Sequence, residues 1–341
     1  MYTNAMRFVT LVAVALMSVA VLAQPPGSQI ELNIGEISDG LHVVTTGGGV
    51  SPVFVFLATD DGILVVDPPN PTATNLFKEA LDERFPGVPV RYVVESHYHW
   101  DHVGGTRLFA DTAEFVAHEN MATFLAGTLS EAPPPGNTRD TDGDNRLSRE
   151  EALTGTRANF DRFDTNEDDY LTPEEINADI QPPTVLFSGD YEIELGGYRV
   201  QLLWARNRHT NDLIDVYFPD HRVLFAGDYV WINRMCCNFA FDERPMSVWI
   251  ESLRALEELD FDTLINSHFA SGTKEDLVAF RVWLETLEAG VSDGIANGLT
   301  LEQMQEELTF AAYSDWAGYE QQLPTIIESA YLSLTRYSAA P

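Results

Sequence analysis

Residues 97–102 read His-Tyr-His-Trp-Asp-His and are the most constraining segment of the chain. Packing alone gives no reason for such a cluster, because burying an unpaired charge or an unsatisfied imidazole destabilises a core. A strand-like run precedes it, and side chains two residues apart in an extended chain point the same way, so His97 and His99 can bind one ion together. Asp101 and His102 follow as the chain turns into a helix, and they can face a second ion. The segment therefore predicts a metal site at the end of a strand.

Three further candidate ligands follow later strand-like runs. They are His209 in a His-Thr pair, Asp228 in a Gly-Asp pair, and His268 after Asn266-Ser267. Because α/β folds place their chemistry at the carboxyl ends of strands, we expect these side chains to join the first cluster.

Hydrophobic patterning predicts an α/β protein. Short apolar runs between Leu41 and Pro68 are separated by turn residues and indicate a strand meander. Helical spacing is found over Thr72–Phe85 and is expected over Asp101–Phe109, whereas Tyr191–Ala205 is typical of a strand. The chain from Ser247 onward is mostly helical in pattern. Strands in both halves, each followed by helices, predict four layers, helix, sheet, sheet and helix, that is, an αββα sandwich.

Residues 137–180 differ in composition from the rest of the chain. Proline-rich segments flank them, and they contain 13 acidic residues against five arginines. Such a change marks an insertion. We therefore divide the chain into a leader, 1–23, a main domain made of 24–136 and 181–341, and an inserted helical subdomain, 137–180.

Two 12-residue segments of the insertion, Asp140–Glu151 and Asp164–Glu175, repeat one pattern in the same register and resemble EF-hand loops. Their oxygen-bearing side chains suit Ca²⁺, which takes six to eight oxygen ligands. The sixth position, usually Gly, is Asn145 or Asp169, residues that tolerate positive φ less freely. The expected calcium-site residues are Asp140, Asp142, Asp144, Arg146 and Glu151 in the first loop, and Asp164, Asn166, Asp168, Tyr170 and Glu175 in the second.

The resemblance to EF-hands implies two Ca²⁺ ions, bound more weakly because the usual glycines are missing, and extracellular calcium would fill even weak sites. The short spacing predicts that Ala152–Phe163 is a single shared helix with Phe160 and Phe163 as its apolar contacts. Ordering of a lid or flap is the expected role, rather than signalling.

The motifs His-x-His-x-Asp-His, His-Thr, Gly-Asp and a late His resemble those of the metallo-β-lactamase-fold hydrolases, over residues 40–340 apart from the insertion. The resemblance implies two zinc ions: one held by His97, His99 and His209, the other by Asp101, His102 and His268, with Asp228 bridging. It also implies that Asp67 supports the ligands without binding an ion. His118 matches a recurring histidine of exported members, and either a supporting or a purely structural role is open for it.

In such a site, two Zn²⁺ ions lower the pKa of a shared water to about 7, which gives hydroxide at neutral pH. That hydroxide would attack the carbonyl of a lactone, thioester, ester or β-lactam, or in some relatives a phosphodiester, and Asp101 is the expected catalytic proton carrier. A ligand set of His and Asp with no Cys favours zinc, but such a set also binds iron or manganese. In the resemblance, Asp228 matches the residue that lactonases and thioesterases carry at the bridging position, whereas true β-lactamases usually carry Cys or Ser there. Trp100, Trp231 and Phe239 are candidates for the substrate wall.

Two other functions remain open. The first is a mononuclear iron dioxygenase that oxidises a persulfide or thiol. Such enzymes share the fold and the histidine pattern that this sequence resembles, and His97, His209 and Asp228 would hold the iron. A non-catalytic calcium-dependent binding protein would use the insertion alone.

The charge of the chain narrows its partners. Among 341 residues, 53 Asp and Glu outnumber 20 Lys and Arg, for a formal net charge of −33. This excess repels phosphate backbones, so we expect a small-molecule substrate and no nucleic-acid partner. The two cysteines, Cys236 and Cys237, are adjacent and cannot form a disulfide framework.

The first residues are typical of a signal peptide. Arg7 precedes an apolar run, Phe8–Ala23, and Val21 and Ala23 occupy the positions that signal peptidase recognises. The run is shorter than the roughly 20 residues that span a bilayer. We therefore expect export to the periplasm or medium, with no membrane anchor after cleavage.

Overall fold

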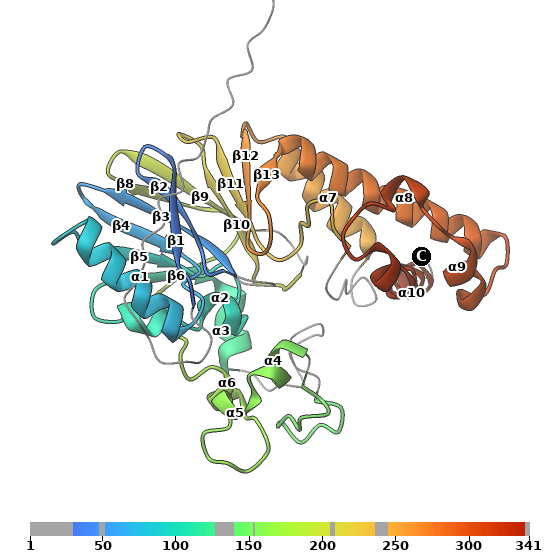
Figure 1. Ribbon diagram of the computed structural model, residues 1–341, viewed down its shortest axis with the longest axis horizontal. Helices are drawn as coiled ribbons and strands as arrows, with labels where there is room; N and C mark the ends of the chain where they lie inside the picture. The colour runs from blue at the N-terminus through green and yellow to red at the C-terminus, as the bar shows by residue number, and fades with distance from the viewer. Residues whose placement is uncertain are drawn as a thin grey trace, which may run out of the picture.

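The computed structural model describes residues 30–47, 52–126, 140–152, 154–204, 209–235 and 245–337. The expected leader, the two cysteines and Phe239 lie outside these ranges, so export remains a prediction. Among the described residues, no helix combines the length and apolar character needed to cross a membrane. Two β-sheets face each other at the centre of the molecule (Figure 1).

The first sheet contains seven strands in sequence order. Its first four strands are antiparallel neighbours, and the pairs from β4 to β7 are parallel. The strands are β1 (Asn33–Ser38), β2 (Leu41–Thr45), β3 (Val53–Thr59), β4 (Gly62–Val66), β5 (Val90–Val94), β6 (Glu114–His118) and β7 (Val185–Phe187).

The second sheet contains six strands in the order β13-β12-β11-β10-β9-β8. All its neighbours are antiparallel except β11 and β12, which run parallel. The strands are β8 (Tyr191–Leu195), β9 (Tyr198–Trp204), β10 (Ile214–Phe218), β11 (Val223–Ala226), β12 (Thr263–Asn266) and β13 (Gly272–Thr273).

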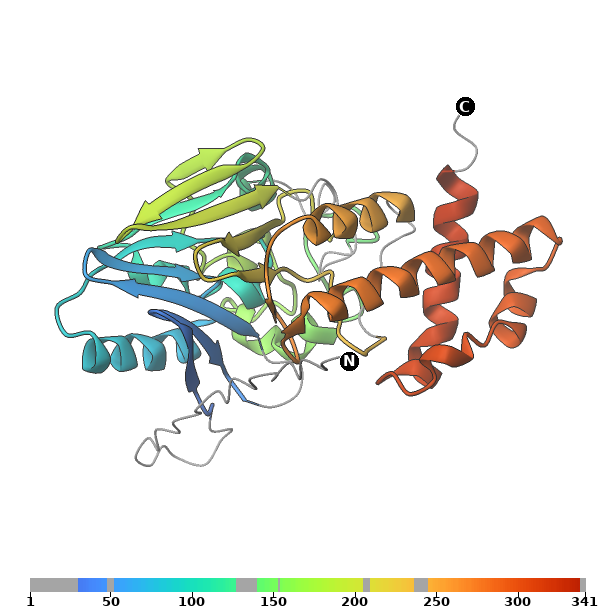
Figure 2. The same cartoon turned by 90° about the horizontal axis from the view of Figure 1, so that it is seen from above.

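Helices cover the outer face of each sheet, which confirms the predicted order of four layers (Figures 1 and 2). On the first sheet, Phe77 of α1 (Pro71–Arg84) packs edge-on against Phe54 of β3. On the second sheet, buried residues of α7 (Met246–Glu257) and α8 (Lys274–Ala296) join one apolar cluster with Leu224 and Leu264. The facing surfaces of the two sheets form a separate core. The remaining helices at the C-terminal end are α9 (Leu301–Glu307), the 3-10 turn η2 (Ala311–Tyr313) and α10 (Tyr319–Tyr337).

Two expected elements are interrupted at glycine pairs. The helix expected over Asp101–Phe109 is instead α2 (Trp100–Val103) followed by the 3-10 turn η1 (Thr106–Phe109). A Cβ atom at Gly104 would lie 2.9 Å from Pro69 O, so glycine is needed for this close approach. The single strand expected over Tyr191–Ala205 is a hairpin, because Gly196 and Gly197 adopt positive φ and turn the chain between β8 and β9.

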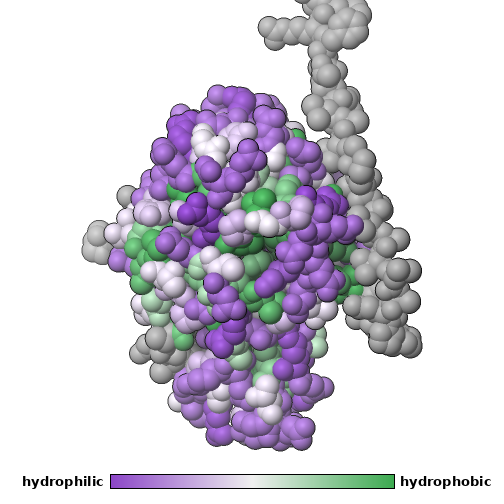
Figure 3. All heavy atoms as spheres, turned by 90° about the vertical axis from the view of Figure 1, so that its left-hand side faces the viewer, coloured by the Kyte–Doolittle hydropathy of each residue, from purple (hydrophilic) through white to green (hydrophobic). Residues whose placement is uncertain are grey.

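The described residues of the insertion contribute no strand to either sheet and lie below them in Figure 1, after α3 (Glu119–Ala126). Its short helices are α4 (Thr154–Ala158), α5 (Phe160–Phe163) and α6 (Pro173–Ile176). The prediction of one helix over Ala152–Phe163 was wrong, because Asn159 leaves helical geometry between α4 and α5. Phe160 and Phe163 are buried, as expected. The face shown in Figure 3 is mostly hydrophilic, in keeping with the acidic composition.

Candidate metal centre

The predicted transition-metal ligands gather at one edge of the two sheets. His97 and His99 follow β5, and His209 lies in the connection before β10. β11 and β12 pair in parallel up to their last residues. Asp228 and His268, each two positions beyond its strand, therefore emerge side by side.

Backbone hydrogen bonds join the two sheets at this edge. Ile214 N, at the start of β10, donates to Ser96 O at 2.9 Å, and Val53 N donates to Ser267 O at 2.6 Å. Ser96 and Ser267 directly precede the ligand residues His97 and His268. The bonds thus fix the backbone beside a ligand from each sheet.

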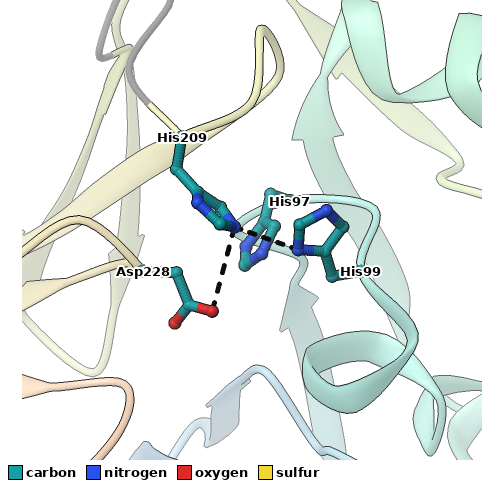
Figure 4. Close-up of side chains that lie close together, drawn as sticks. All are labelled: His97, His99, His209 and Asp228. Atoms are coloured by element: carbon teal, nitrogen blue, oxygen red, sulfur yellow. Dashed lines mark hydrogen bonds and ion pairs between the residues drawn. The ribbon is translucent and has the colours of Figure 1, made fainter. Parts of the chain in front are cut away.

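The first half-site consists of His97, His99 and His209, which point toward one another and toward Asp228 (Figure 4). His209 Nε2 lies 3.1 Å from His99 Nδ1 and 3.9 Å from Asp228 Oδ2. The four side chains each offer a donor atom, and these atoms lie within 4.8 Å of one another.

The second half-site consists of Asp101, His102 and His268, again with Asp228. His102 Nε2 lies 3.1 Å from Asp228 Oδ2 and 3.2 Å from His268 Nε2. His268 Nε2 lies 3.3 Å from Asp228 Oδ2 and 3.5 Å from Asp101 Oδ2. Asp228 therefore belongs to both half-sites, and the arrangement is consistent with a dinuclear metal site.

Asp67 contacts ligands of both half-sites. It follows β4 with φ 56°, a left-handed conformation that Asp adopts more readily than most residues. Its Oδ1 accepts a hydrogen bond from Ser96 N at 2.7 Å, and its Oδ2 lies 3.4 Å from His102 Nδ1. The Ser96 hydroxyl donates to Asp67 Oδ2 and lies 3.0 Å from His97 Nδ1. Asp67 thus orients imidazoles through their far nitrogens, a role typical of carboxylates around metal sites.

Sequence reasoning missed three residues that hold the site. Ser96 acts as described above, Ser267 Oγ donates to Asp228 Oδ1, and Asp212 Oδ2 accepts a hydrogen bond from Tyr98 N at 2.8 Å. The two serines carried a signal, since each directly precedes a ligand histidine. Asp212 follows His209 closely, but nothing in the sequence links it to Tyr98.

The two half-sites differ in electrostatics. Burial lowers the pKa of His99 to about 4, and burial with repulsion from His102 and His99 lowers the pKa of His97 well below its usual range. Burial would also lower the pKa of His268, but Asp228 and Asp101 outweigh it and raise the pKa to about 9. For Asp101, the nearby His102 and His268 outweigh burial and hold the pKa at about 2. His97 and His99 of the first half-site thus offer neutral imidazoles, the form that binds metal.

The residues fit a pair of metal ions. Within the described part of the chain, His97 Nε2 and Asp101 Oδ1 are buried and make no hydrogen bond. Buried polar atoms are nearly always paired, and a metal ion among these donors would satisfy them. Imidazole and carboxylate donors suit zinc, iron and manganese alike.

His118 lies outside both half-sites. Its ring stacks on Trp204 with centroids 4.5 Å apart, and its Nδ1 accepts a hydrogen bond from Asn120 N at 3.3 Å. Asn120 Nδ2 and Trp204 Nε1 both donate to Asn211 O, at 2.9 and 3.0 Å. His118 therefore belongs to a network beside the loop that carries His209.

Two of the expected wall residues pack inside the protein. Trp231 is 4% exposed and lies between Trp249 and Phe280. Trp100 packs against the insertion, with its ring edge-on to Phe163. These contacts do not identify either residue as part of a substrate-binding wall.

The two loops of the insertion share one hydrogen-bond pattern. The final glutamate of each loop accepts bonds from the backbone N–H groups of the second and ninth residues, as in Glu151 with Thr141 and Ser148. Leu147 and Leu171, the eighth residues, form two backbone hydrogen bonds with each other, both of 2.9 Å. In the first loop, donor atoms of Asp140, Asp142 and Glu151 lie within 4.8 Å of one another.

The sixth residue of each loop has a positive φ, 64° at Asn145 and 63° at Asp169. These are the positions where the sequence lacks the usual glycine. The other expected calcium-site residues lie within the same two loops, and their carboxylate or amide oxygens mostly accept backbone hydrogen bonds, as Asp144 does from Arg146 and Asp168 does from Tyr170.

Comparison with known proteins gives the family. The sequence pattern that defines the metallo-beta-lactamase superfamily matches residues 46–268, which include all seven candidate ligands. The chain belongs to the metallo-beta-lactamase superfamily. Together with the His/Asp cluster, this membership indicates a metal-dependent enzyme, either a hydrolase or an oxidoreductase.

One curated relative is 2,4-dinitroanisole O-demethylase subunit alpha from Nocardioides sp. (strain JS1661). It is 26% identical over 261 residues, which cover 72% of this chain and 65% of the relative. The chain thus spans slightly less than two thirds of that protein's length.

Two solved structures share the fold at low identity. A metallo-beta-lactamase from Pontibacter korlensis matches with a TM-score of 0.53 and 17% identity, over 75% of this chain and 99% of its own. A stereoselective inverting sec-alkylsulfatase from Pseudomonas sp. matches with a TM-score of 0.59 and 15% identity, over 90% of this chain and 50% of its own. At these identities the likeness concerns the fold alone.

Proposed function

We propose that the protein is an exported dinuclear zinc hydrolase that acts on a small-molecule carbonyl compound such as a lactone, thioester, ester or β-lactam. The observation that carries the proposal is the position of Asp228. Its Oδ2 lies 3.1 Å from His102 Nε2 in the second half-site and 3.9 Å from His209 Nε2 in the first. A carboxylate shared by two sets of three ligands is what a two-metal centre requires, whereas a mononuclear site needs only one set.

When bound, a pair of divalent ions would supply a water acidic enough to react as hydroxide and an electrophile for the substrate oxygen. The residues of the chain would do the rest. Ser267 donates to Asp228 Oδ1 and so fixes the orientation of the shared carboxylate. Asp67 and Ser96 hold the imidazoles of His102 and His97.

Asp101 is the proposed proton carrier. Its side chain is 24% exposed, compared with 8% for His268 and 0% for His102, so it offers a route from the centre to solvent. Its low pKa keeps it ionised at neutral pH.

Elemental analysis of the purified protein is the first test. About two zinc ions per chain would support the hydrolase. About one iron with little zinc would favour the alternative, oxidation of a persulfide or thiol at His97, His209 and Asp228. Either result is independent of knowing the substrate.

Activity should then be screened on lactones, thioesters, β-lactams and phosphodiesters. The names of the relatives add sec-alkyl sulfates and 2,4-dinitroanisole to the panel. Chelation should abolish any hydrolysis, and zinc should restore it. Hydrolysis that survives in both His99→Ala and Asp101→Ala proteins would overturn the assignment.

We further propose that each loop of the insertion binds one Ca²⁺ ion and that calcium orders the insertion. Support comes from the shared hydrogen-bond pattern, the convergent donors of Asp140, Asp142 and Glu151, and the backbone pairing of Leu147 with Leu171. Isothermal titration with Ca²⁺ tests the stoichiometry. Two equivalents are expected, and none would contradict the proposal.

A further inference from the structure

Helix α2 connects the metal centre to the insertion. Two of its four residues, Asp101 and His102, are metal ligands. The other two pack on the insertion or on its exit. Trp100 joins the buried apolar cluster of the insertion, and Val103 shares a cluster with Ile180, where the chain returns to the main domain. The cluster around Trp100 contains Leu147, Ala152, Phe160, Phe163, Leu171 and Ile176.

The insertion surrounds the indole of Trp100 on more than one side. Phe163 of α5 meets it edge-on, with ring centroids 5.1 Å apart and planes at 73°. The guanidinium of Arg162 lies 5.9 Å from the ring centroid. From the start of α4, Gly155 also lies beside the indole, since a Cβ atom added there would be in van der Waals contact with Trp100 Cζ2 at 3.9 Å. The main domain therefore supplies the aromatic side chain that completes the insertion's core.

This packing bears directly on metal ligands, because Trp100 lies between His99 and Asp101 in the chain. A helix of one turn is not stable by itself and takes its position from tertiary contacts. On one side, Gly105 N donates to Pro68 O at 2.9 Å and holds α2 against the loop after Asp67. On the other side, α2 is held by the insertion through Trp100.

We propose that Trp100 is a positioning residue, through which the packed core of the insertion holds His99 and Asp101 in metal-binding geometry. Metal sites require their ligands within about 0.5 Å of the productive arrangement, so loss of this contact should disturb both half-sites. The consequence for turnover rests on the proposed hydrolase function, but the effect on ligand geometry does not.

The test uses full-length Co²⁺-substituted protein, whose visible absorption reports ligand geometry directly. In Trp100→Ala and in Phe163→Ala we expect an altered spectrum and at least about tenfold weaker binding of the more weakly held Co²⁺ ion, the size typical of losing an outer contact at a metal site. Because both substitutions remove the same contact, the double variant should be no worse than Trp100→Ala alone. Trp100→Phe should restore the parent spectrum.

Trp283→Ala is the matched control. Trp283 is fully buried against Phe310 and Tyr313 in the C-terminal helices, away from the insertion. It should lower the melting temperature and leave the cobalt spectrum unchanged. An unchanged spectrum in Trp100→Ala, additive losses in the double variant, or the same change in Trp283→Ala would each overturn the proposal.

Kinetics separate this proposal from the hydrolase. Where a substrate is found, kcat should fall at least about tenfold in Trp100→Ala with KM within about threefold of the parent. A parent protein inactive on every substrate, with the cobalt changes as expected, would count against the hydrolase alone. An active parent with an unaffected Trp100→Ala variant would count against the positioning role alone.

Discussion

The metal centre and the insertion both gather acidic side chains, but they are assembled in opposite ways. The centre draws its ligands from separate strand ends between His97 and His268 and buries most of them. Each loop of the insertion draws its donors from 12 consecutive residues and leaves most of them exposed. In the loops the carboxylates accept hydrogen bonds from their own backbone, as Asp140 does from Gly143 and Asn145.

The two regions should therefore differ in how much a bound ion stabilises them. At the centre, carboxylates and imidazoles lie 3–4 Å apart, and atoms such as His97 Nε2 have no hydrogen-bond partner among the described residues. Unpaired buried polar groups destabilise a fold, so ions should contribute strongly there. In the loops the backbone already satisfies the carboxylates, so ions should change stability modestly. The following predictions test this contrast.

The largest effect is expected from Asp228→Ala. Losing the shared carboxylate affects both half-sites at once, so bound metal should fall from two ions to at most one and hydrolysis should drop at least about 1,000-fold. Metal analysis and single-substrate kinetics provide the measurement. Asp220→Asn, which removes an exposed pair with Arg199, is the control and should change neither. Retention of two metal ions in Asp228→Ala would contradict the difference proposed between the metal centre and the insertion.

A smaller loss is expected from Ser96→Ala. The hydroxyl contacts both Asp67 and His97, so its removal should weaken metal affinity by about 10–100-fold, the range for groups that orient metal ligands. Competition with a chromophoric chelator measures this affinity. Ser252→Ala, whose hydroxyl donates to Val248 O within α7, is the matched control. Equal affinity in the two variants would contradict the supporting role.

Calcium should have a moderate effect. At a concentration 100 times the dissociation constant, each bound ion adds about 2.7 kcal/mol, so two ions should add about 5.4 kcal/mol and raise the melting temperature by about 10 °C. Glu151→Gln combined with Glu175→Gln should remove the rise, because both loops lose their final ligand. Differential scanning calorimetry with Ca²⁺ or EGTA measures it. A rise that persists in the double variant would place calcium binding elsewhere.

The smallest effect concerns acid. Hydrogen bonds from Thr141 and Ser148 hold the pKa of Glu151 at about 2, below its usual value of 4.5. This stabilisation is fully present above about pH 4.5 and is lost as the pH falls through about 2. Because the group is partly exposed, we expect a difference of only about 1–3 °C between the parent and Glu151→Gln in EGTA, and it should vanish toward pH 2. Melting curves between pH 6 and 2 test this.

Glu150→Gln is the control for the acid effect, since the Glu150 side chain accepts no hydrogen bond within the described ranges. It should keep the pH dependence of the parent. Identical pH profiles for all three proteins would show that the Glu151 contacts do not contribute.

The ligands could be predicted from the sequence because their signal is local. The pattern consists of three histidines and an aspartate within six residues, followed by short pairs such as Gly227-Asp228. It can be recognised even where the surrounding secondary structure is predicted wrongly. The four layers could be predicted because apolar runs and helical spacing reflect burial.

The errors arose where distant contacts decide. A side chain at Gly104, where α2 ends, would clash with Trp100 O and, at 2.9 Å, with Pro69 O, and the second of these contacts is distant in the sequence. Nothing local marks Asn159 as the break between α4 and α5. Likewise, nothing in the sequence shows that Trp100 packs against Phe163, a contact that the fold creates.

The backbone pairing of Leu147 with Leu171 and the cluster around it also limit how far the insertion can be regarded as a module. The described residues of the insertion place six buried side chains in this cluster, which is a very small core, and such cores seldom fold without help. Here the help is Trp100, a residue of the host. Transplanting residues 137–180 into another scaffold should therefore fail unless an aromatic residue is transplanted with them, and deleting them should leave an apolar indole exposed beside the metal ligands. The folded unit formed by the insertion therefore includes a residue, Trp100, that lies outside the inserted segment of the sequence.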